Sequence, residues 1–429
     1  MRNNLVSLSV RLIKHELITG SFYIFLGAMV SNVLAFFLNL FLARNLSYGD
    51  YAIFASLLSL ITLAAIPASS INTIIVKFAT DYFARKQEHK LKTLYVTFLK
   101  FIVFICIAII AFSFALGSPI RNFLNLDSNL YVIATGLTVC SFYLLVLNNA
   151  FLQSLMKFRF ISLISAIGGV LKLIIGVVFV FLGYKAYGGI GAIFFMTFAM
   201  FILAFIPLLK ILRLKQSEKI SLNTKEILKY SVPAFITVLF LTSFTSTDVI
   251  LAKHFFNPHL AGFYAGLSLV GKVIFYFTAP IPMVMFPLLV KRFAVGKNFN
   301  NLFYLALALV ILPSVLITAF YFIFPNFVVK LFLGGRDYLY ISQYLGIFGV
   351  YLTVFSMVNV CVNFFLSINK TVIWIFVVGA AILQIVLIFL YHADFLQIIE
   401  ISLSVLSVLL VILLYIFFKN YGRLGKIRA

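Results

Sequence analysis

Three charged residues lie inside long apolar runs of the sequence, where they could hold an ion or a charged substrate. Lys172 and Lys272 each stand near the middle of a run, and Asp248 closes the polar stretch Thr242–Thr247 in a third run. A lysine or aspartate at the centre of a membrane-spanning helix costs about 2.5–3.5 kcal/mol on insertion scales. Such residues usually face a cavity or a partner, so these three are the first candidates for a site.

The two central lysines have two interpretations. Neither can easily reach the nearer membrane surface, because a helix rises by about 1.5 Å per residue. They could present positive charge to an anionic substrate in a water-filled cavity. They could instead form structural ion pairs, or hydrogen bonds to carbonyls of neighbouring helices. Lys100 lies nearer the end of its run, where its side chain can snorkel to the surface.

Asp248 also has two interpretations, pairing with Lys272 or Lys253 and binding a coupling cation. Pairing is favoured, because a buried carboxylate without a partner is expensive. Amide side chains add further polar atoms within the runs, and these usually form hydrogen bonds between helices, although they could also bind sugar hydroxyls. They are Asn32, Asn72, Asn148, Gln153, Gln384 and the pair Asn359 and Asn363, which are one helical turn apart. The predicted substrate-binding residues are Lys272, Asp248, Lys172, Asn32, Asn359 and Asn363.

The composition indicates which elements position these residues. Hydrophobic residues make up 64% of the 429 positions, charged residues make up 10%, and the mean hydropathy is +1.15. A soluble domain has about half apolar and a quarter charged residues, so this chain has too few polar side chains to cover a surface in water. The three cysteines, Cys106, Cys140 and Cys361, fall inside apolar runs and are predicted to be core residues. The chain is predicted to be an integral membrane protein.

Runs long enough to cross a bilayer recur along the whole chain, since a span needs about 20 apolar residues. The run that contains Pro280, Pro282 and Pro287 is overlong, and its prolines predict a bend or a break. We predict an all-α fold with about 12 transmembrane helices in two six-helix bundles related by pseudo-twofold symmetry. The predicted helices are 19–43, 51–76, 95–117, 129–153, 161–183, 188–209, 231–252, 260–290, 301–324, 341–367, 371–391 and 396–418.

The distribution of basic residues predicts the orientation of these helices. With a cytoplasmic N-terminus, 24 of the 33 lysines and arginines fall in inner segments and six in outer ones. Inner loops of membrane proteins are enriched in basic residues. Both termini are therefore predicted to be cytoplasmic, in the plasma membrane, which also accounts for the net charge of +22. Residues 1–18 combine basic residues with leucines at helical spacing and are predicted to form an amphipathic helix on the inner membrane surface.

The two halves of the chain repeat a short pattern. Leu42-Ala43-Arg44 matches Leu251-Ala252-Lys253 at an offset of 209, and Gly49-Asp50-Tyr51-Ala52 matches Gly262-Phe263-Tyr264-Ala265 at an offset of 213. The longest polar stretch lies between the halves. Parallel halves around a central site are an architecture of transporters. The predicted domains are an amphipathic segment 1–18, bundles 19–209 and 231–418, a cytoplasmic linker 210–230 and a basic tail 419–429.

The same segments resemble a known family. The run Leu42–Ala55 is similar to the first outer loop of the polysaccharide (O-antigen type) flippases, which belong to the multidrug/oligosaccharidyl-lipid/polysaccharide exporter superfamily. Further similarities are Tyr230–Pro233, Asp248–Lys253, Ala261–Tyr264, Pro287, and Gly176 with Lys172. The resemblance covers the whole chain through loose patterns. It implies twelve helices, a V-shaped central cavity and transbilayer movement of sugar repeat units linked to polyprenyl pyrophosphate.

Motifs for enzymes and for metals are weak in this sequence. The run Gly266–Val273 is one residue short of a phosphate-binding loop and has valine where Mg²⁺ needs a hydroxyl. His254 and His259 lack a matching carboxylate or cysteine cluster. Asp394 and Glu400 are six residues apart and fall on different helix faces. We therefore expect no enzymatic activity, no cofactor and no metal.

The leading hypothesis for the function is a flippase for lipid-linked oligosaccharides in polysaccharide biosynthesis. Its expected partners are this substrate, membrane lipids and the polysaccharide polymerase machinery, with no nucleic acid. The alternatives are a cation-coupled exporter of small molecules from the same superfamily and a membrane-bound polymerase or transferase. The low acidic content of the spans disfavours the exporter, because drug/cation antiporters of the superfamily usually carry carboxylates in the first bundle.

Overall fold

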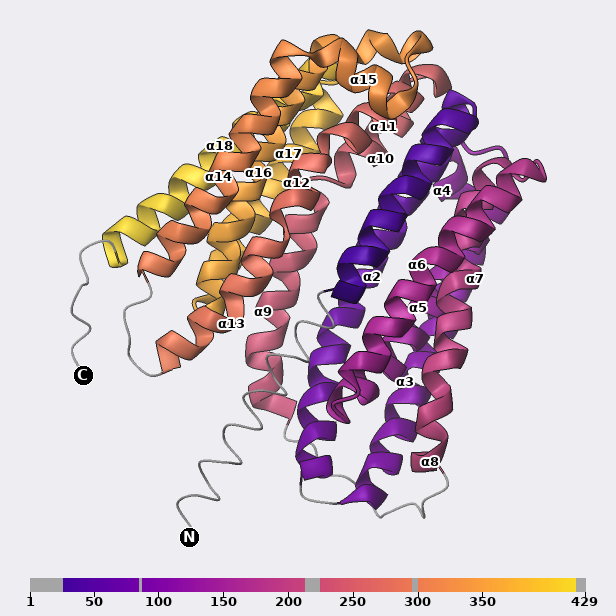
Figure 1. The fold of residues 1–429 in the computed structure, drawn as a ribbon, viewed down its shortest axis with the longest axis vertical. Helices are drawn as coiled ribbons and strands as arrows, with labels where there is room; N and C mark the ends of the chain where they lie inside the picture. Colours follow the sequence, from indigo (N-terminus) through magenta and orange to yellow (C-terminus); the bar gives the residue numbers. More distant parts are fainter. Residues whose placement is uncertain (1–25, 85–86, 213–223, 295–299, 422–429) are drawn as a thin grey trace. The chain divides into compact units, whose positions relative to one another are not determined.

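The computed structural model describes residues 26–84, 87–212, 224–294 and 300–421 (Figure 1). All regular elements within these ranges are helices. Eleven of the described helices are long and apolar enough to cross a membrane, and the bent pair Val232–Ser243 and Thr247–Phe255 makes a twelfth span. The predicted class of an all-α, multi-pass membrane protein with about twelve spans is therefore confirmed. The amphipathic helix predicted for 1–18 lies outside the described residues.

The internal contacts divide the chain into two compact units, which we describe separately. The first unit contains the described chain up to Asn45 and the part from Ala64 to the end of the first half. Its central helix is α5, which contacts α3, α6 and α7. The helices of the first half are Leu26–Asn45, α2 (Tyr48–Ala84), α3 (Glu88–Ala115), α4 (Gly117–Phe123), α5 (Leu130–Ser154), α6 (Phe158–Phe181), α7 (Lys185–Phe205), the 3-10 turn η1 (Ile206–Leu208) and α8 (Leu209–Leu212).

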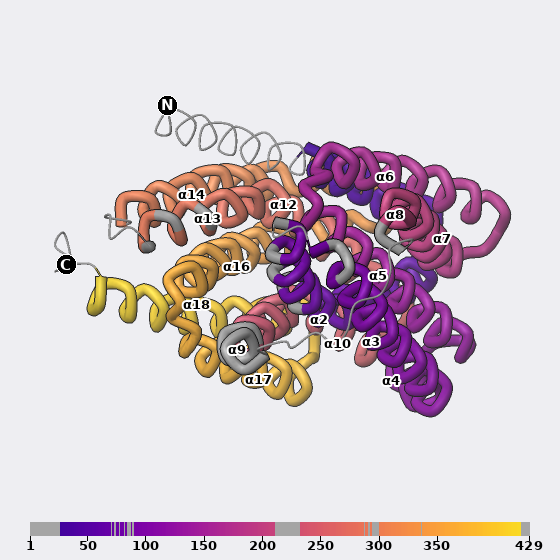
Figure 2. Tube along the Cα trace, turned by 90° about the horizontal axis from the view of Figure 1, so that it is seen from below, coloured from indigo at the N-terminus to yellow at the C-terminus, as the bar shows by residue number. Residues whose placement is uncertain are grey.

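The second unit contains Leu46–Leu63 and the described chain from Thr224 onward. Its central helix is α16, which contacts α11, α12, α13, α14 and α18, and Figure 2 shows α16 with α13 and α14 on one side and α18 on the other. Its further helices are α9 (Thr224–Ser243), α10 (Thr247–Phe255), α11 (Pro258–Gly271), α12 (Val273–Thr278), α13 (Pro280–Ala294), α14 (Asn300–Ile323), α15 (Pro325–Leu333), η2 (Arg336–Ile341), α16 (Ser342–Ser367), η3 (Thr371–Ile373), α17 (Trp374–Leu390) and α18 (Phe395–Asn420).

The first turns of α2 pack on α11, and this contact explains their place in the second unit. A side chain on Gly262 would come within 2.2 Å of the carbonyl oxygen of Tyr48, so the close approach requires glycine. The Tyr48 ring contacts His259, Phe263 and Tyr338, with centroid distances of 4.6–5.0 Å. Gly262 belongs to the repeated pattern in the sequence. The predicted domain boundaries, 19–209 and 231–418, remain predictions.

The predicted seventh span, 231–252, is present as the bent pair α9 and α10, and its bend was not predicted. It is bent by 44° between α9 and α10. The hydroxyls of Thr242 and Ser243 donate hydrogen bonds to carbonyls within their own helix, and the amides of Thr245 and Ser246 bond only three residues back. Side-chain hydroxyls compete with the regular ladder of a helix, and three-residue bonds tighten it. The polar stretch therefore interrupts the helix.

The overlong eighth span is divided, as its prolines predicted. It consists of α11, α12 and α13, and α13 begins at Pro280. Proline suits the first turn of a helix because its missing N–H would have no partner there. A second interruption at Lys272 was not predicted. It follows Gly271, where a side chain would come within 2.2 Å of the Phe348 ring.

The two halves share one connection in detail. After α5, Met156 adopts φ +55° and the amide of Lys157 donates to the Leu152 carbonyl at 2.9 Å. After α16, Asn369 adopts φ +59° and the amide of Lys370 donates to the Phe365 carbonyl at 2.9 Å. These positions are 213 residues apart, the offset of the Gly49 pattern. The structure therefore repeats the geometry as well as the sequence pattern.

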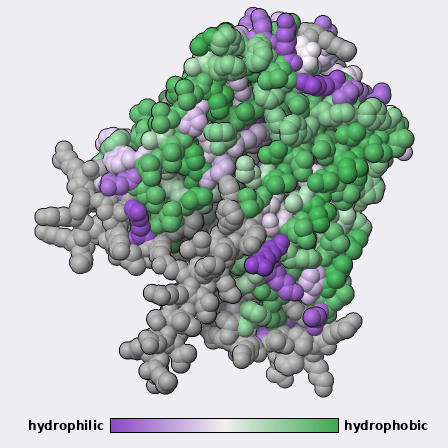
Figure 3. Space-filling model, in the orientation of Figure 1, coloured by the Kyte–Doolittle hydropathy of each residue, from purple (hydrophilic) through white to green (hydrophobic). Residues whose placement is uncertain are grey.

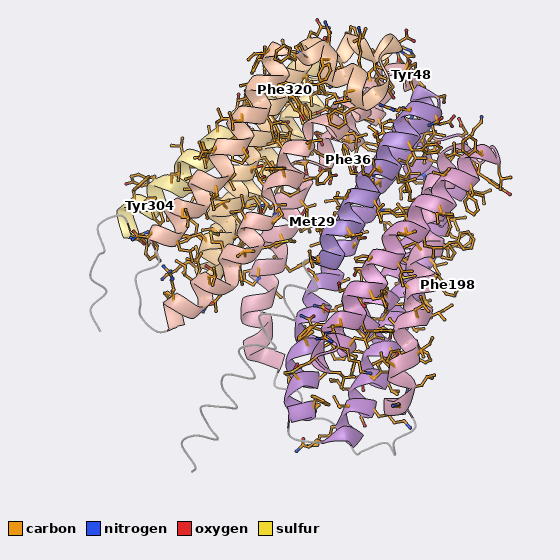
Figure 4. The ribbon with its side chains drawn as sticks, in the orientation of Figure 1. Met29, Phe36, Tyr48, Phe198, Tyr304 and Phe320 are labelled. Atoms are coloured by element: carbon orange, nitrogen blue, oxygen red, sulfur yellow. The ribbon has the colours of Figure 1, made fainter. Side chains whose placement is uncertain are left out.

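The described surface is largely apolar. Figure 3 shows apolar residues over most of the visible face, with hydrophilic residues gathered mainly toward its margins. Large side chains such as Phe104, Phe181 and Leu316 are at least 69% exposed. Phe198 and Phe320, labelled in Figure 4, are also exposed. Lipid is the solvent that suits such a surface.

Candidate functional site

The break between α9 and α10 leaves carbonyl groups that the helix does not use. The Phe244 carbonyl oxygen accepts hydrogen bonds from the Tyr351 hydroxyl at 2.7 Å and from Gln384 Nε2 at 3.2 Å. Gln384 Nε2 also donates to the Ser402 hydroxyl at 2.8 Å. Helices α16, α17 and α18 thus each supply one polar group that fixes this break. Carbonyl groups freed within a membrane must find such partners.

Asp248 lies in the first turn of α10 and is completely buried. Its Oδ1 accepts a hydrogen bond from the Val249 amide at 2.8 Å, and its Oδ2 accepts one from the Tyr264 hydroxyl at 3.2 Å. The positive end of the helix dipole also favours negative charge at this position. The break in the seventh span therefore creates a helix start inside the unit, and Asp248 occupies it.

Lys272 stands at the junction of α11 and α12 and is half-buried. Asp248 lies close enough to attract its ammonium group electrostatically. The ammonium group donates no hydrogen bond and forms no ion pair with any residue that the structure describes. The N–H groups of the Lys272 ammonium can therefore donate hydrogen bonds to a bound ligand. Lys253, the other predicted partner of Asp248, is buried in α10.

Ser268 completes a group of polar side chains that we call the Asp248–Lys272 cluster, formed by Asp248, Tyr264, Ser268 and Lys272. Ser268 precedes Lys272 by four residues, so the two lie on one helix face. Its hydroxyl is buried and finds no hydrogen-bond partner among the described residues. A hydroxyl and an ammonium group without partners can both bind an anionic or hydroxyl-bearing ligand.

The other predicted lysine lies in the first unit. Lys172 is a half-buried residue of α6, and it forms no hydrogen bond or ion pair within the described part of the chain. Asn32 lies on the helix Leu26–Asn45 and is exposed. These two helices approach closely, since side chains on Gly169 and Gly176 would clash with Ser31 and Leu38. Small residues at helix contacts are typical of membrane proteins.

The predicted amide residues serve different purposes. Asn359 and Asn363 are half-buried, and Asn363 Nδ2 donates to the Asn359 carbonyl at 2.8 Å and to its Oδ1 at 2.9 Å. Their bonds lie within α16 and do not join two helices. Asn148 does join helices, because it accepts from the Tyr95 hydroxyl and donates to the Phe201 carbonyl. Asn72 is half-buried in α2.

The histidines and cysteines do not form a metal site in the described residues. No group of three potential metal ligands occurs there. His259 contacts the rings of Tyr48 and Phe263, and His254 contacts Phe255. The three cysteines are buried and free, in agreement with their prediction as core residues.

Tyr264 and Tyr351 contribute to the site but were not predicted from the sequence. Tyr264 stands in the repeated pattern Gly262–Ala265, which marks close packing, and this pattern could have drawn attention to it. Tyr351 had no such signal, because its role depends on the position of a carbonyl more than 100 residues away.

The comparisons with known proteins agree with this architecture. A family model described as a polysaccharide biosynthesis protein matches residues 17–293, which is more than half of the chain. The chain belongs to this family. The match confirms the resemblance to the polysaccharide flippases of the exporter superfamily. No curated protein matches the chain.

Solved structures show the same fold. A multidrug resistance MATE family transporter of the MOP superfamily, in an inward-facing conformation, aligns with TM-score 0.70 and 13% identity over 93% of this chain and 96% of its own. The lipid II flippase MurJ, in an inward closed conformation, aligns with TM-score 0.67 and 18% identity over 94% and 87%. The eukaryotic MATE transporter AtDTX14 aligns with TM-score 0.67 and 13% identity over 94% and 96%. The chain therefore has the transporter fold of this superfamily.

Proposed function

We propose that this protein moves a lipid-linked oligosaccharide across the cytoplasmic membrane for polysaccharide biosynthesis. The observation that carries the proposal is the ammonium group of Lys272, which stands at a helix break and finds no hydrogen-bond partner in the described residues. A cation in a medium of low dielectric constant attracts a phosphate or an acidic sugar strongly. Membership of the polysaccharide biosynthesis family supports this class of substrate.

The other members of the Asp248–Lys272 cluster have defined roles in this proposal. Asp248 stabilises the charge of Lys272, and Tyr264 holds the carboxylate in place. Ser268 offers a hydroxyl to the ligand. Lys172, Asn32, Asn359 and Asn363 are proposed to contact the substrate as it crosses the membrane. Alternation between two six-helix bundles would expose the site to each leaflet in turn, and this step requires no catalysis and no cofactor.

Replacement of Lys272 tests the proposal. Lys272→Ala should abolish export of the glycan while the protein level in the membrane stays normal, and Lys272→Arg should retain part of the export because it keeps the charge. Lys330→Ala, at an exposed lysine of α15, is the control and should export normally. Export would be measured as surface polysaccharide and, after reconstitution, as movement of a labelled polyprenyl-pyrophosphate sugar across vesicles. Normal export by Lys272→Ala would overturn the proposal.

The proposed orientation places both termini in the cytoplasm, where partners such as a polysaccharide polymerase complex could assemble around the protein. Cysteines introduced at 85–92 and in the C-terminal tail should be protected from an impermeant reagent in intact cells. A cysteine at position 336 should react. Labelling of the 85–92 region from outside would contradict this orientation.

A second candidate function is a cation-coupled exporter of small molecules. The buried carboxylate of Asp248, which has no ion pair within hydrogen-bonding distance in the described residues, favours it. This function predicts that dye efflux depends on a sodium or proton gradient and is lost in Asp248→Asn. Unchanged dye efflux after collapse of both gradients would exclude it.

A further inference from the structure

A pocket of about 490 Å³ lies in the second unit, away from the Asp248–Lys272 cluster. It is formed where α16 ends, where η3 leads into α17, and where α18 ends. Val372, Phe376 and Ile416 supply an apolar wall, whereas Lys370, Asn420 and Tyr421 supply polar groups. Val372 is 65% exposed and Phe376 is 40% exposed, so the pocket is open to the surroundings.

The pocket lies at the level of a membrane surface. Three spans reach their ends beside it, since α16 ends at Ser367, α17 begins at Trp374 and α18 ends at Asn420. Tryptophan, tyrosine and lysine gather at the boundary between lipid and water. Trp374, the single tryptophan of the sequence, stands beside Ile373 of the pocket lining. These residue types at the ends of three spans are those expected near a membrane surface.

Residues in and next to the pocket lining pack against α14. Asn300 Nδ2 donates to the Tyr421 carbonyl at 2.7 Å. The Phe417 ring lies 4.3 Å from that of Phe303 and 5.6 Å from that of Tyr304, which Figure 4 labels. Phe417 is completely buried. The pocket is therefore part of the folded unit and does not depend on the exposed side chains alone.

Lys370 supplies the charge of the pocket. The turn at Asn369 fixes its backbone, and its side chain is exposed without an ion pair to any described residue. The residues after Tyr421 include Arg423, Lys426 and Arg428 and no acidic residue. Charge complementarity therefore requires an anionic occupant. The apolar wall requires that the occupant also carry a hydrocarbon chain.

We propose that this pocket binds an anionic phospholipid, independently of the substrate that the protein carries. The phosphate lies against Lys370 and Asn420, and one acyl chain lies along Val372, Phe376 and Ile416. A lysine at the membrane surface changes the affinity for an anionic lipid by about fivefold. With both termini cytoplasmic, the lipid belongs to the inner leaflet.

Trp374 gives a direct measurement, because all tryptophan fluorescence of the protein comes from this residue. The full-length protein is reconstituted with brominated phosphatidylglycerol or brominated phosphatidylcholine, which quench tryptophan at short range. We expect half-maximal quenching at about fivefold less phosphatidylglycerol than phosphatidylcholine. Lys370→Gln should quench equally with both lipids.

Lys157→Gln is the matched control, because Lys157 occupies the same position in the equivalent turn after α5. It should keep the wild-type preference, and inorganic phosphate should not reverse the quenching. Equal quenching of the wild type by both lipids would overturn the proposal. So would a preference retained in Lys370→Gln, a preference lost equally in Lys157→Gln, or displacement of the lipid by phosphate, which would indicate a site for the free anion.

Discussion

The opening hairpins of the two halves have the same pattern but different chemistry. At the offsets of the repeat, Asn39 corresponds to Asp248, Ser59 to Lys272 and Tyr51 to Tyr264. Asn39 and Ser59 donate hydrogen bonds to carbonyls of their own helices, at 2.8 and 3.0 Å. Their counterparts carry charge and lie at helix breaks. In the second half, the charged residues Asp248 and Lys272 stand at helix breaks. In the first half, the equivalent residues are uncharged and lie within continuous helices.

The comparison indicates that at these repeated positions charged side chains occur where a helix is interrupted. A continuous helix satisfies its own carbonyls and amides, so it offers a side chain no free backbone group. A break supplies a helix start for Asp248 and a junction for Lys272. The candidate site residues Asp248 and Lys272 therefore stand at backbone interruptions, which the first half does not have at the equivalent positions.

Among exchanges between the two halves, the largest effect is expected from Lys272→Ser, which installs the residue of the first half. A hydrogen bond to a charged group contributes about 1.5–3 kcal/mol, which corresponds to roughly 10–150-fold in transport rate. Ser59→Ala, the matched change in the first hairpin, should leave transport within about twofold of the wild type. Rates in reconstituted vesicles decide the comparison, and similar losses in both variants would remove the proposed asymmetry.

A smaller effect is expected from Asp248→Asn. The single amide oxygen keeps one of the two hydrogen bonds that the carboxylate accepts from the Val249 amide and the Tyr264 hydroxyl, and Lys272 loses the charge that stabilises it. We expect a reduction of about 3–10-fold, since nearby charges in proteins contribute about 1 kcal/mol or more. Asn39→Ala should export normally. Transport by Asp248→Asn at the wild-type rate would show that the carboxylate does not serve Lys272.

The smallest effect on transport is expected from Tyr264→Phe, which acts mainly on stability. The variant leaves Asp248 with one fewer hydrogen bond, at a cost of about 1–3 kcal/mol. Thermal unfolding in detergent should show a lower midpoint. Tyr51→Phe should unfold like the wild type within about 0.5 kcal/mol, because Tyr51 donates no hydrogen bond within the described residues. Equal midpoints for both variants would contradict the role given to Tyr264.

The sequence predicted the helices well, because length and hydropathy alone identify a span. The predicted helices 129–153, 301–324 and 396–418 differ from α5, α14 and α18 by at most two residues at either end. The bend near Phe244 was not predicted, because a stretch of threonines and serines weakens a helix but does not by itself fix the position and angle of a bend. It depends on Tyr351 and Gln384, whose positions the fold determines.

The candidate site was predictable only in part. An ionisable residue at the centre of a span is a reliable signal, so Asp248 and Lys272 were found by position. Their surroundings were not, since Tyr264 and Ser268 look like ordinary residues of an apolar run. For Asn359 and Asn363, the spacing correctly placed both on one helix face. It could not show that their amides bond to each other, because that depends on rotamers.

The two hydrogen bonds to the Phe244 carbonyl have a mechanical consequence. They tie the corner between α9 and α10 to α16 and α17, so straightening the span would break both bonds together. We therefore expect this corner to be rigid and not to act as a hinge. Its 44° angle should stay the same when the protein changes conformation. A displacement of α9 should then move α16 and α17 with it, so that these helices move as one rigid group.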